Sequence, residues 1–462
     1  MHSTPADSVF KAYDIRGLVP AQIDANFAWR LGRAVGRLAR RQGTNSVIAG
    51  RDGRLSSPML AAALIDGLLM EGVDALDIGL VPTPLVYFAT HTLGTGSGVM
   101  VTGSHNPADQ NGFKVTMMGR TLHGTGIQAI GEAMSALGGH PAAATAGTRR
   151  AIDMFDAYVD RIRGDITLER PMRIAVDCGS GAGGVIAARL YETLGCDVEC
   201  LFCDVDGHFP HHHPDPSVPR NLVDLQNHLR ASHCDVGLAF DGDADRLGVV
   251  ARNGETIWPD RLLILFARDV LRRHPGATVI YDVKCSRHVG REIRAAGGCP
   301  LMWKTGHSIM EAKLAASGAP LAGELSGHVF FKDRWYGFDD GLYAGARLLE
   351  ILSRAPDATA VLRGLPSGVA TPELKIALRA GEPPALIARL RADAAFPTAE
   401  RIVTIDGVRA EYADGFGLAR ASNTTSAVTL RFEGDTPRAL ARIQNEFRTV
   451  LRRLAPDATL PF

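Results

Sequence analysis

The chain has 462 residues, and at about 150 residues per domain this length predicts three or four domains. Its 50 Lys and Arg residues balance 50 Asp and Glu residues, and the zero net charge argues against a general binder of nucleic acid or anionic membranes. No apolar run approaches the roughly 20 residues of a membrane helix and residues 1–10 do not resemble a signal peptide, so we expect a cytoplasmic protein.

Strand and helix patterns alternate over the first three quarters of the chain. Strands are predicted at 46–50, 99–101, 173–178, 236–240, 247–251 and 278–283, and helices at 26–41, 57–72, 152–163 and 185–194. Strand–helix blocks recur at intervals of about 100 residues, which is the pattern of repeated α/β domains. We therefore expect three related α/β domains with mixed, mainly parallel sheets.

The last part of the chain has a different pattern. Strands are predicted at 402–405 and 427–432, between helices at 384–394 and 437–454, as in an α+β domain. Gly-rich or Pro-rich stretches at 138–147 and 364–372, and a turn at Asn253-Gly254, separate the blocks. The predicted domains are residues 1–149, 150–254, 255–367 and 368–462.

Three of the seven cysteines lie close together and raise the question of a zinc site. Cys196, Cys200 and Cys203 are followed by His208 and by the histidines at 211–213. The cysteines lie in a strand-like stretch, where residues an odd number apart face opposite sides, so Cys200 and Cys203 would not converge on one ion. We interpret them as structural thiols, and the Pro-rich histidine loop as a turn or a domain contact.

The first candidate for chemistry is the loop Thr-Gly-Ser-His-Asn-Pro at 102–107, directly after a predicted strand. Gly103 and Pro107 would hold Ser104 on a tight turn with an exposed hydroxyl. The loop is not the nucleophile elbow of hydrolases, because Thr102 and Asn106 stand where that motif needs glycine. An ordinary turn is the alternative interpretation.

The second candidate is the acidic loop at 241–246, between two apolar strands. Asp241, Asp243 and Asp245 alternate along an extended segment, so their carboxylates point to one side and repel one another unless a cation lies among them. An EF-hand is excluded because Arg246 and Arg252 stand where Gly and Glu are needed, and the open coordination sites favour Mg²⁺. A solvated acidic loop is the alternative.

Two further loops offer groups for binding a sugar phosphate. The loop Gly-Glu-Leu-Ser-Gly-His at 323–328 presents a carboxylate, a hydroxyl and an imidazole, which suit sugar hydroxyls. The segment 420–426 combines Arg420 with several hydroxyls, which suit a phosphate dianion, although a polar hairpin loop is equally compatible.

Two glycine-containing segments point to nucleotides. Residues 179–184 match G-x-G-x-x-G between a strand and a helix, with Asp204 about 20 residues on, and this keeps an oxidoreductase as an alternative class. The same segment is equally compatible with a tight strand–helix turn. Residues 298–305 fail as a P-loop because Trp303 stands where the second glycine belongs.

Taken in this order, the motifs resemble the α-D-phosphohexomutase superfamily, most closely its bacterial phosphomannomutase/phosphoglucomutase branch. The resemblance begins at Tyr13-Asp14-Ile15-Arg16-Gly17, includes residues 304–308, and covers nearly the whole chain. It implies three related α/β domains and a mobile C-terminal α+β domain around a central cleft. It also implies that the segment 179–184 is structural.

The resemblance assigns a role to each motif. Ser104 would carry a phosphoryl group, and Mg²⁺ would be held by Asp241, Asp243, Asp245 and an oxygen of the phosphorylated Ser104. Sugar hydroxyls would contact Glu324, Ser326 and His328. The phosphate that does not react would be bound by Arg420, Ser422, Asn423, Thr424 and Thr425, with Tyr13, Lys284 and His307 completing the pocket.

The implied reaction is reversible phosphoryl transfer between the 1- and 6-positions of mannose and glucose phosphates. It would proceed through phosphoserine and a hexose 1,6-bisphosphate, with glucose 1,6-bisphosphate as intermediate and activator. Arg246 would stabilise the transferred group, and Lys114 or Arg16 would handle the hydroxyl proton. Two alternative functions stay open, a metal-dependent phosphatase and a non-catalytic sugar-phosphate binder. The protein is expected to be a monomer.

Overall fold

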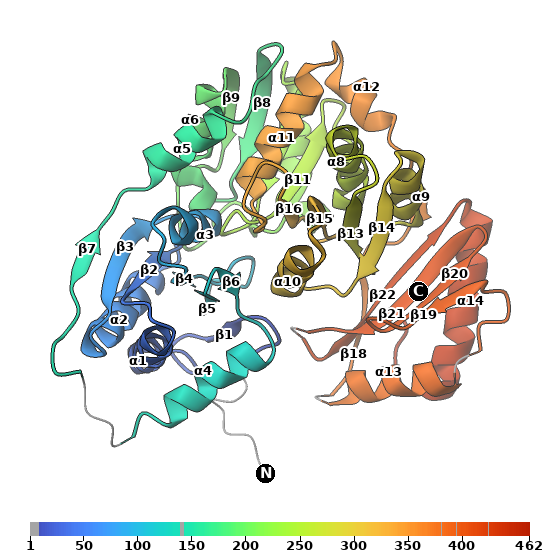
Figure 1. The fold of residues 1–462 in the computed structure, drawn as a ribbon. Helices are drawn as coiled ribbons and strands as arrows, with labels where there is room; N and C mark the ends of the chain where they lie inside the picture. The colour runs from blue at the N-terminus through green and yellow to red at the C-terminus, as the bar shows by residue number, and fades with distance from the viewer. Residues whose placement is uncertain (1–8, 139–142, 380, 394, 424) are drawn as a thin grey trace.

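The computed structural model describes residues 9–138, 143–379, 381–393, 395–423 and 425–462. Four sheets follow one another along the chain, and Figure 1 shows their domains in an arc with the first and the fourth at its two ends. None of the helices in the described ranges combines the length and the apolar character that crossing a membrane requires.

The first domain has a mixed sheet in the order β1-β5-β4-β2-β3-β7, with β6 paired to β5. Its strands are β1 (Ile15–Leu18), β2 (Ser46–Arg51), β3 (Asp74–Leu80), β4 (Gly98–Val101), β5 (Gln110–Met117), β6 (Arg120–Thr121) and β7 (Arg149–Ala151). Helices α1 (Ala25–Arg41), α2 (Ser57–Met70) and α4 (Thr125–Ser135) share one core with the sheet. Helix α3 (Thr83–Thr92) instead belongs to the core that continues into the next two domains.

The second domain has the strand order β12-β11-β10-β8-β9. Its strands are β8 (Met172–Asp177), β9 (Cys196–Leu201), β10 (Val236–Phe240), β11 (Leu247–Ala251) and β12 (Thr256–Ile257), and its helices are α5 (Phe155–Arg163), α6 (Ala187–Thr193) and α7 (Val223–Ala231), with short 3₁₀ turns η2 (Ala182–Val185) and η3 (Pro219–Leu222). Ile174 and Val176 face one core and Ala175 the other, because successive side chains of a strand point to opposite faces. Both faces of the sheet are therefore covered.

The third domain has the strand order β14-β13-β15-β16. Its strands are β13 (Thr278–Asp282), β14 (Cys299–Trp303), β15 (Leu321–Gly323) and β16 (Val329–Phe331), and its helices are α8 (Pro259–Arg273), α9 (Arg287–Ala295), α10 (His307–Ser317), α11 (Gly341–Ser353) and α12 (Ala358–Arg363). Helix α11 also contacts the second domain, since Tyr191 donates a hydrogen bond to the carbonyl of Leu342 at 2.9 Å. Domains two and three consequently share one hydrophobic core.

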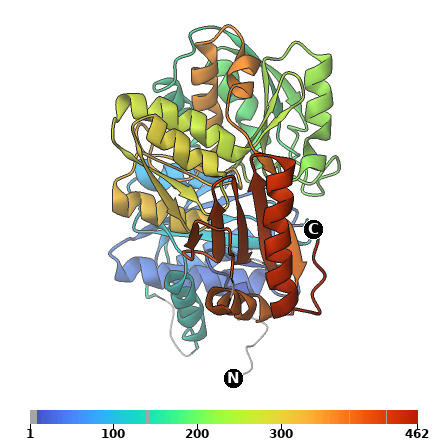
Figure 2. The same cartoon turned by 90° about the vertical axis from the view of Figure 1, so that its right-hand side faces the viewer.

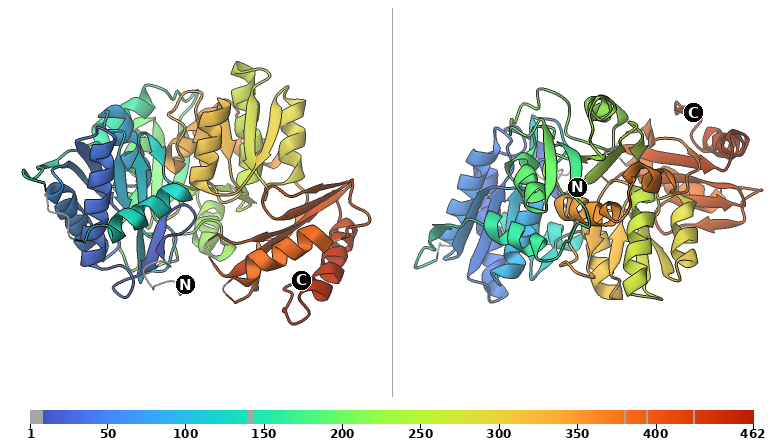
Figure 3. Two further views of the ribbon diagram at one scale, coloured as in Figure 1. Left: turned by 60° about the horizontal axis from the view of Figure 1, so that its bottom comes forward. Right: turned by 90° about the horizontal axis from the view of Figure 1, so that it is seen from above.

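The fourth domain has a largely antiparallel sheet, β17-β22-β21-β20-β19, with β18 also paired to β22. Its strands are β17 (Val369–Ala370), β18 (Leu374–Ala377), β19 (Arg401–Val403), β20 (Val408–Tyr412), β21 (Gly415–Ala421) and β22 (Ala427–Gly434), and its helices are α13 (Glu382–Asp393) and α14 (Pro437–Leu454). Figure 2 shows α14 lying along this sheet, and Figure 3 shows the domain at the end of the molecule opposite the first domain.

The predicted fold class is confirmed, and most predicted elements lie within a few residues of their observed bounds. The helix predicted at 152–163 begins only at Phe155, because residues 149–151 form β7 and extend the first sheet. The helix predicted at 185–194 is broken, since η2 ends at Val185 and α6 begins at Ala187. Strands β20 and β21 were not predicted, because Gly415 and Gly417 interrupt the apolar pattern of β21.

Candidate active site

Ser104 lies in the loop that follows β4, in a left-handed backbone conformation with φ of 47°. The expectation of an exposed hydroxyl is wrong, because Ser104 is only 1% exposed. Its Oγ donates a hydrogen bond of 2.7 Å to Oδ2 of Asp241 in the second domain. Gly242 permits this close approach, since a Cβ there would lie 2.3 Å from the Ser104 carbonyl oxygen.

Arg54 anchors the serine loop through hydrogen bonds to its carbonyl oxygens. The sequence analysis did not predict a role for this residue. This fully buried guanidinium donates to the carbonyl oxygens of Ser104 at 2.8 Å and of Gln110 at 2.9 Å. A single Arg after a strand has no sequence pattern that distinguishes it from a surface residue. His213 also contacts the loop by donating to the carbonyl of His105, so the predicted domain contact of the histidine loop is confirmed.

The three carboxylates of the acidic loop lie together between β10 and β11. Asp241, Asp243 and Asp245 are all 0% exposed, and each places an oxygen within 4.8 Å of the others. The loop is therefore buried, in contrast to the solvated alternative. Burial and the negative charges of its two neighbours raise the pKa of Asp241 well above its ordinary value.

The surroundings of these carboxylates fit a small divalent cation. The Lys114 ammonium on β5 contacts Asp245 and lies 2.7 Å from Oδ2 of Asp243, and Thr83 donates to the same oxygen at 2.5 Å. Oδ1 of Asp243 is buried and has no hydrogen-bond partner among the described residues. Buried carboxylate oxygens that outnumber their donors are what a hard cation such as Mg²⁺ needs.

Two arginines flank the serine and the acidic loop. Arg16 is held by Asp14, with Nε 2.8 Å from the carboxylate, and donates to the carbonyl oxygen of Gly103. Nε of Arg246 lies 3.8 Å from Oδ2 of Asp241. Both predicted arginines therefore reach the region of Ser104.

The loop between β15 and β16 forms a hydrogen-bonded cluster next to the acidic loop. Nδ1 of His328 lies 2.9 Å from Oε2 of Glu324 and 2.9 Å from the Ser326 hydroxyl, and Nε2 lies 3.4 Å from Oδ1 of Asp245. Burial lowers the pKa of His328, but the Asp245 and Glu324 carboxylates outweigh it and raise this pKa to about 9. Nε of Arg246 donates a hydrogen bond of 3.2 Å to Nε2 of His328, which connects this cluster to the acidic loop.

Glu324 also connects this cluster to the start of α10. Its Oε1 accepts a hydrogen bond of 2.6 Å from the backbone N–H of Gly306. The next residue, His307, is 4% exposed, and its Nε2 has no hydrogen-bond partner within the described part of the chain. The ring of Tyr13, from the first domain, packs edge-on against His307 with centroids 5.2 Å apart.

The fourth domain reaches the same region through Arg420. Its Nε donates to Asp406 at 3.0 Å, and the same carboxylate oxygen accepts from the backbone N–H of Thr305 at 3.1 Å. Nη2 of Arg420 is buried and has no partner in the described residues. Lys284 links the third and fourth domains by an ion pair of 2.9 Å with Glu373.

The rest of the predicted phosphate loop is more exposed. The Thr425 hydroxyl donates to Oγ of Ser422 at 3.0 Å, and Asn423 is half-buried. The predicted residue Thr424 lies outside the described residues. Loops of all four domains thus meet. The sequence reasoning gave no role to Arg54, Thr83, Asp406 and Glu373, nor to the His105 side chain, whose Nδ1 lies 3.0 Å from Oγ of Ser104.

The glycines at 179–184 pack against the acidic loop. A Cβ at Gly181 would lie 2.9 Å from the Gly242 backbone, and the Ala182 N–H donates to the Gly242 carbonyl at 2.9 Å. This close packing supports the structural interpretation of the segment over a dinucleotide site. Cys200 and Cys203 hydrogen-bond each other, contrary to the expectation from strand alternation, because β9 ends at Leu201 and Phe202 turns the chain with φ of 51°. The interpretation of the cysteines as structural thiols stays a prediction.

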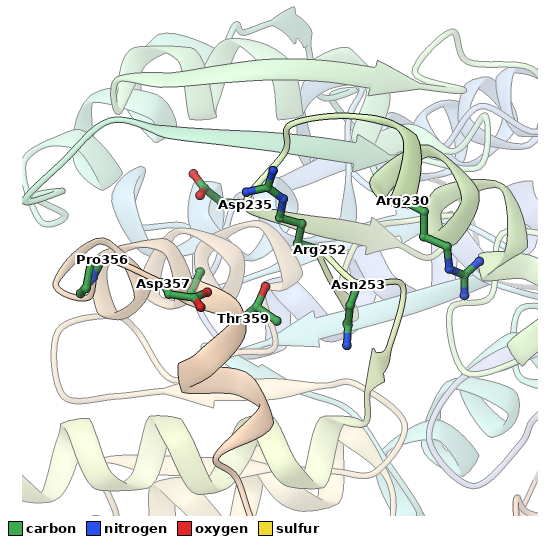
Figure 4. A pocket seen from close by; sticks show the side chains of 8 residues that line it. Arg230, Asp235, Arg252, Asn253, Pro356, Asp357 and Thr359 are labelled. Atoms are coloured by element: carbon green, nitrogen blue, oxygen red, sulfur yellow. The ribbon is translucent and has the colours of Figure 1, made fainter.

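A pocket of about 510 Å³ lies away from this region, between the β11–β12 turn and α12. Figure 4 shows its lining side chains, which come from Arg230, Asp235, Arg252, Asn253, Pro356, Asp357, Ala358 and Thr359. This pocket contains none of the predicted site residues. Its lining combines the positive charges of Arg230 and Arg252 with the negative charges of Asp235 and Asp357.

Comparisons with known proteins match the whole chain. Family models described as phosphoglucomutase/phosphomannomutase α/β/α domains I, II and III and C-terminal domain match residues 7–137, 156–254, 258–366 and 373–450. The phosphomannomutase/phosphoglucomutase of Pseudomonas putida is 49% identical over 465 residues and covers 100% of both chains. The phosphoglucomutase of Neisseria meningitidis is 51% identical over 447 residues, which are 96% of this chain and 97% of that protein.

The solved structure of a phosphoglucomutase/phosphomannomutase family protein from Burkholderia thailandensis is 53% identical and superimposes with a TM-score of 0.94 over 100% of both chains. Four domains whose loops meet at a buried serine and an acidic loop define an enzyme of the phosphohexomutase class. The chain belongs to the phosphoglucomutase/phosphomannomutase family and is an isomerase.

Proposed function

We propose that this isomerase transfers a phosphoryl group reversibly between the 1- and 6-positions of hexose phosphates, with Ser104 as the carrier. The observation that carries the proposal is the buried 2.7 Å hydrogen bond between Ser104 Oγ and Asp241. It joins the Ser104 hydroxyl, which can carry phosphate as a stable ester, to the buried carboxylates. A binder without chemistry would not need this contact.

In the proposed reaction, phosphorylated Ser104 gives its phosphoryl group to the free hydroxyl of a hexose monophosphate. The bond from phosphorus to Ser104 Oγ breaks while the bond to the sugar oxygen forms, and the hydroxyl proton finally resides on Oγ. Arg16 and Arg246 stabilise the negative charge of the transferred group. Lys114 and Arg16 are both close enough to the serine loop to be candidates for moving the proton.

Asp241, Asp243 and Asp245 are proposed to hold Mg²⁺, together with an oxygen of the phosphorylated serine. When bound, the ion would supply positive charge that offsets the negative charge of the transferred group. The burial of all three carboxylates and the unpaired Oδ1 of Asp243 support this assignment.

The intermediate is proposed to be a hexose 1,6-bisphosphate, such as glucose 1,6-bisphosphate, which must turn around before it returns its other phosphate to Ser104. Glu324, Ser326 and His328 are proposed to contact sugar hydroxyls in both orientations. The proposed phosphate-binding residues are Arg420, Ser422, Asn423, Thr424 and Thr425, with Tyr13, Lys284 and His307 beside them. The buried, unpaired Nη2 of Arg420 supports this role, because a guanidinium gains most from a bidentate anion.

Mannose and glucose phosphates are the proposed substrates. The relative from Pseudomonas putida carries both sugars in its name, and the relative from Neisseria meningitidis carries glucose only. The expected monomeric state and cytoplasmic location stay predictions.

The proposal is tested by the Ser104→Ala variant and by mass spectrometry. We expect the protein to be isolated partly with one phosphate on Ser104, and the variant to lose at least about 1,000-fold in kcat, since its carrier is missing. Ser97→Ala, which also changes a buried serine next to β4, is the matched control and should retain activity. Wild-type turnover by Ser104→Ala would refute the carrier role, and release of inorganic phosphate as the main product would indicate a phosphatase.

A further inference from the structure

Two thiols of the second domain, those of Cys178 and Cys203, lie side by side. They are next to the glycine segment 179–184, which packs against the acidic loop. Cys178 directly follows β8 and Cys203 follows the neighbouring parallel strand β9. Their sulfurs are 3.6 Å apart, and all seven cysteines are free thiols. A disulfide brings two sulfurs to about 2.05 Å, so this pair must close by roughly 1.5 Å to form one.

The two thiols differ in access to solvent. Cys178 is fully buried, whereas Cys203 is half-buried and can meet a small solute. The hydrogen bond with Cys178 lowers the pKa of the Cys203 thiol, and this effect exceeds the opposing effect of burial. Of these two thiols, Cys203 is the one that an oxidant reaches first. The exposed Cys200 also hydrogen-bonds Cys203, and Cys178 is the partner whose sulfur lies 3.6 Å from that of Cys203.

The pair is connected to the catalytic region by a short run of backbone contacts. The carbonyl oxygen of Cys178 accepts a 2.7 Å hydrogen bond from Gly181, and the next N–H, of Ala182, donates to Gly242. Gly242 stands between two of the three carboxylates and touches Ser104. Consecutive backbone hydrogen bonds thus connect Cys178 to the acidic loop.

We propose that Cys178 and Cys203 form an intramolecular disulfide on exposure to hydrogen peroxide, and that the disulfide slows the enzyme. The Cys203 thiolate attacks one peroxide oxygen, the O–O bond breaks, and a sulfenic acid and hydroxide form. The Cys178 sulfur then attacks the Cys203 sulfur, the S–O bond breaks, and the second hydroxide leaves. Two thiols are oxidised by two electrons, and the peroxide is reduced to two water molecules with the thiol protons.

The effect on rate rests on the proposed function. Closing the sulfur–sulfur distance displaces the turn at 178–182, and a displacement of about 1 Å near a catalytic group can cost on the order of 100-fold in rate. We expect a decrease of about tenfold in kcat, because the acidic loop is held from several other sides. A thiol reductant should restore the rate.

The experiment uses the full chain treated with hydrogen peroxide, quenched by alkylation and digested for peptide mass mapping. We expect a linked peptide pair containing Cys178 and Cys203 and a loss of two hydrogen atoms from the intact mass. Cys178→Ser and Cys203→Ser should not form the link, and Cys299→Ser, which removes an exposed thiol elsewhere, should form it normally.

Peptide mass mapping detects the disulfide whether or not the protein is a mutase. The disulfide proposal and the proposed function can therefore be refuted independently. A link between Cys200 and Cys203, or no link at peroxide concentrations that oxidise Cys299, would overturn the assignment of the pair. A complete Cys178–Cys203 link with an unchanged kcat would overturn the connection to the acidic loop. Rate loss that persists in Cys178→Ser would likewise assign the inhibition to another residue.

Discussion

The two carboxylate oxygens of Asp243 differ in their hydrogen bonds, and this difference favours a role as a metal ligand. One of its oxygens accepts hydrogen bonds from Thr83 and Lys114, whereas the other is buried without a partner among the residues described. An unpaired buried carboxylate oxygen is costly, and a bound cation would remove that cost. Replacement of this residue therefore tests the metal site more directly than replacement of Asp241, which also contacts Ser104.

We expect Asp243→Asn to raise the Mg²⁺ concentration needed for half-maximal turnover by at least about tenfold, since even outer partners of metal ligands cost about 10–100-fold. The measurement is a Mg²⁺ titration of the mutase rate. Asp66→Asn, at an exposed position of α2, is the control and should titrate like the wild type. A wild-type rate that persists in EDTA would contradict a catalytic metal at the acidic loop.

At the scale of elements, α8 and α11 are joined by a buried ion network. Asp269 on α8 accepts hydrogen bonds from Arg354 at 2.7 Å and from Arg273 at 2.8 Å, and the fully buried Arg347 on α11 contacts Asp333 at 2.8 Å. Burial raises the pKa of Asp269, but the hydrogen bonds from Arg354 and Arg272 outweigh it and lower this pKa to about 2. The ionised carboxylate therefore stabilises the contact between the two helices.

Because the folded pKa of Asp269 lies below its ordinary value of 3.8, its contribution is present above pH 3.8 and is lost as pH falls toward 2. We expect Asp269→Asn to lower the free energy of unfolding by about 2 kcal/mol at pH 7, from a shift of nearly two pKa units. The difference from wild type should shrink between pH 4 and pH 2 in denaturant titrations. The exposed Asp160→Asn should change stability by less than about 0.5 kcal/mol, and a pH-independent difference for Asp269→Asn would argue against the linkage.

At the scale of the whole molecule, the fourth domain is attached to the third by a small apolar contact, by Arg409 and by several further polar contacts, among them Lys284–Glu373 and Arg431–Asp260. Val283 of the third domain packs with Phe416 and Leu418 of the fourth. The fully buried Arg409 donates to the carbonyl oxygens of Val283 at 2.6 Å and of Cys285 at 2.7 Å. This attachment positions Arg420 next to the loops of the other domains.

We expect Arg409→Met to leave each domain folded but to weaken this attachment, because two buried carbonyl oxygens lose their donor at about 1–3 kcal/mol each. KM for hexose phosphate should rise about tenfold, whereas kcat should stay within about twofold. Limited proteolysis should cut faster in the segment 364–372. Arg442→Met, on α14 and paired with Asp414, is the control, and equal KM values for the two variants would contradict the docking role.

The convergence of four domains also bears on which sugars are accepted. Glu324 and Ser326 offer a carboxylate and a hydroxyl, which we expect to contact the 3- and 4-hydroxyls, and these keep their relative geometry when the sugar turns around. No residue of the predicted site is assigned to C2, where mannose and glucose differ, and discrimination is weak unless a mismatch leaves a buried polar group unpaired.

We therefore expect kcat/KM for mannose 1-phosphate and glucose 1-phosphate to agree within about tenfold, or roughly 1.4 kcal/mol. Glucosamine 1-phosphate should be converted less well. Steady-state rates with the three sugars test this expectation. A preference above about a hundredfold for either hexose would show that C2 is contacted.

The sequence by itself determined the elements and loops whose signals are local. Strands β10 and β11 were predicted to the residue, because apolar runs bounded by charged residues are short-range patterns. The acidic loop was recognisable for the same reason, since its three carboxylates are adjacent in the chain. The order of the motifs was enough to predict the family.

Only the tertiary structure decided which distant residues meet. Thr83 and Asp243 are 160 positions apart, and Arg54 and Ser104 are 50 apart, so no local pattern indicates either contact. The burial of Ser104 was mispredicted for the same reason, because the acidic loop of another domain covers its hydroxyl. Local apolar periodicity determines helices and strands, whereas contacts between domains depend on how the finished sheets pack against one another.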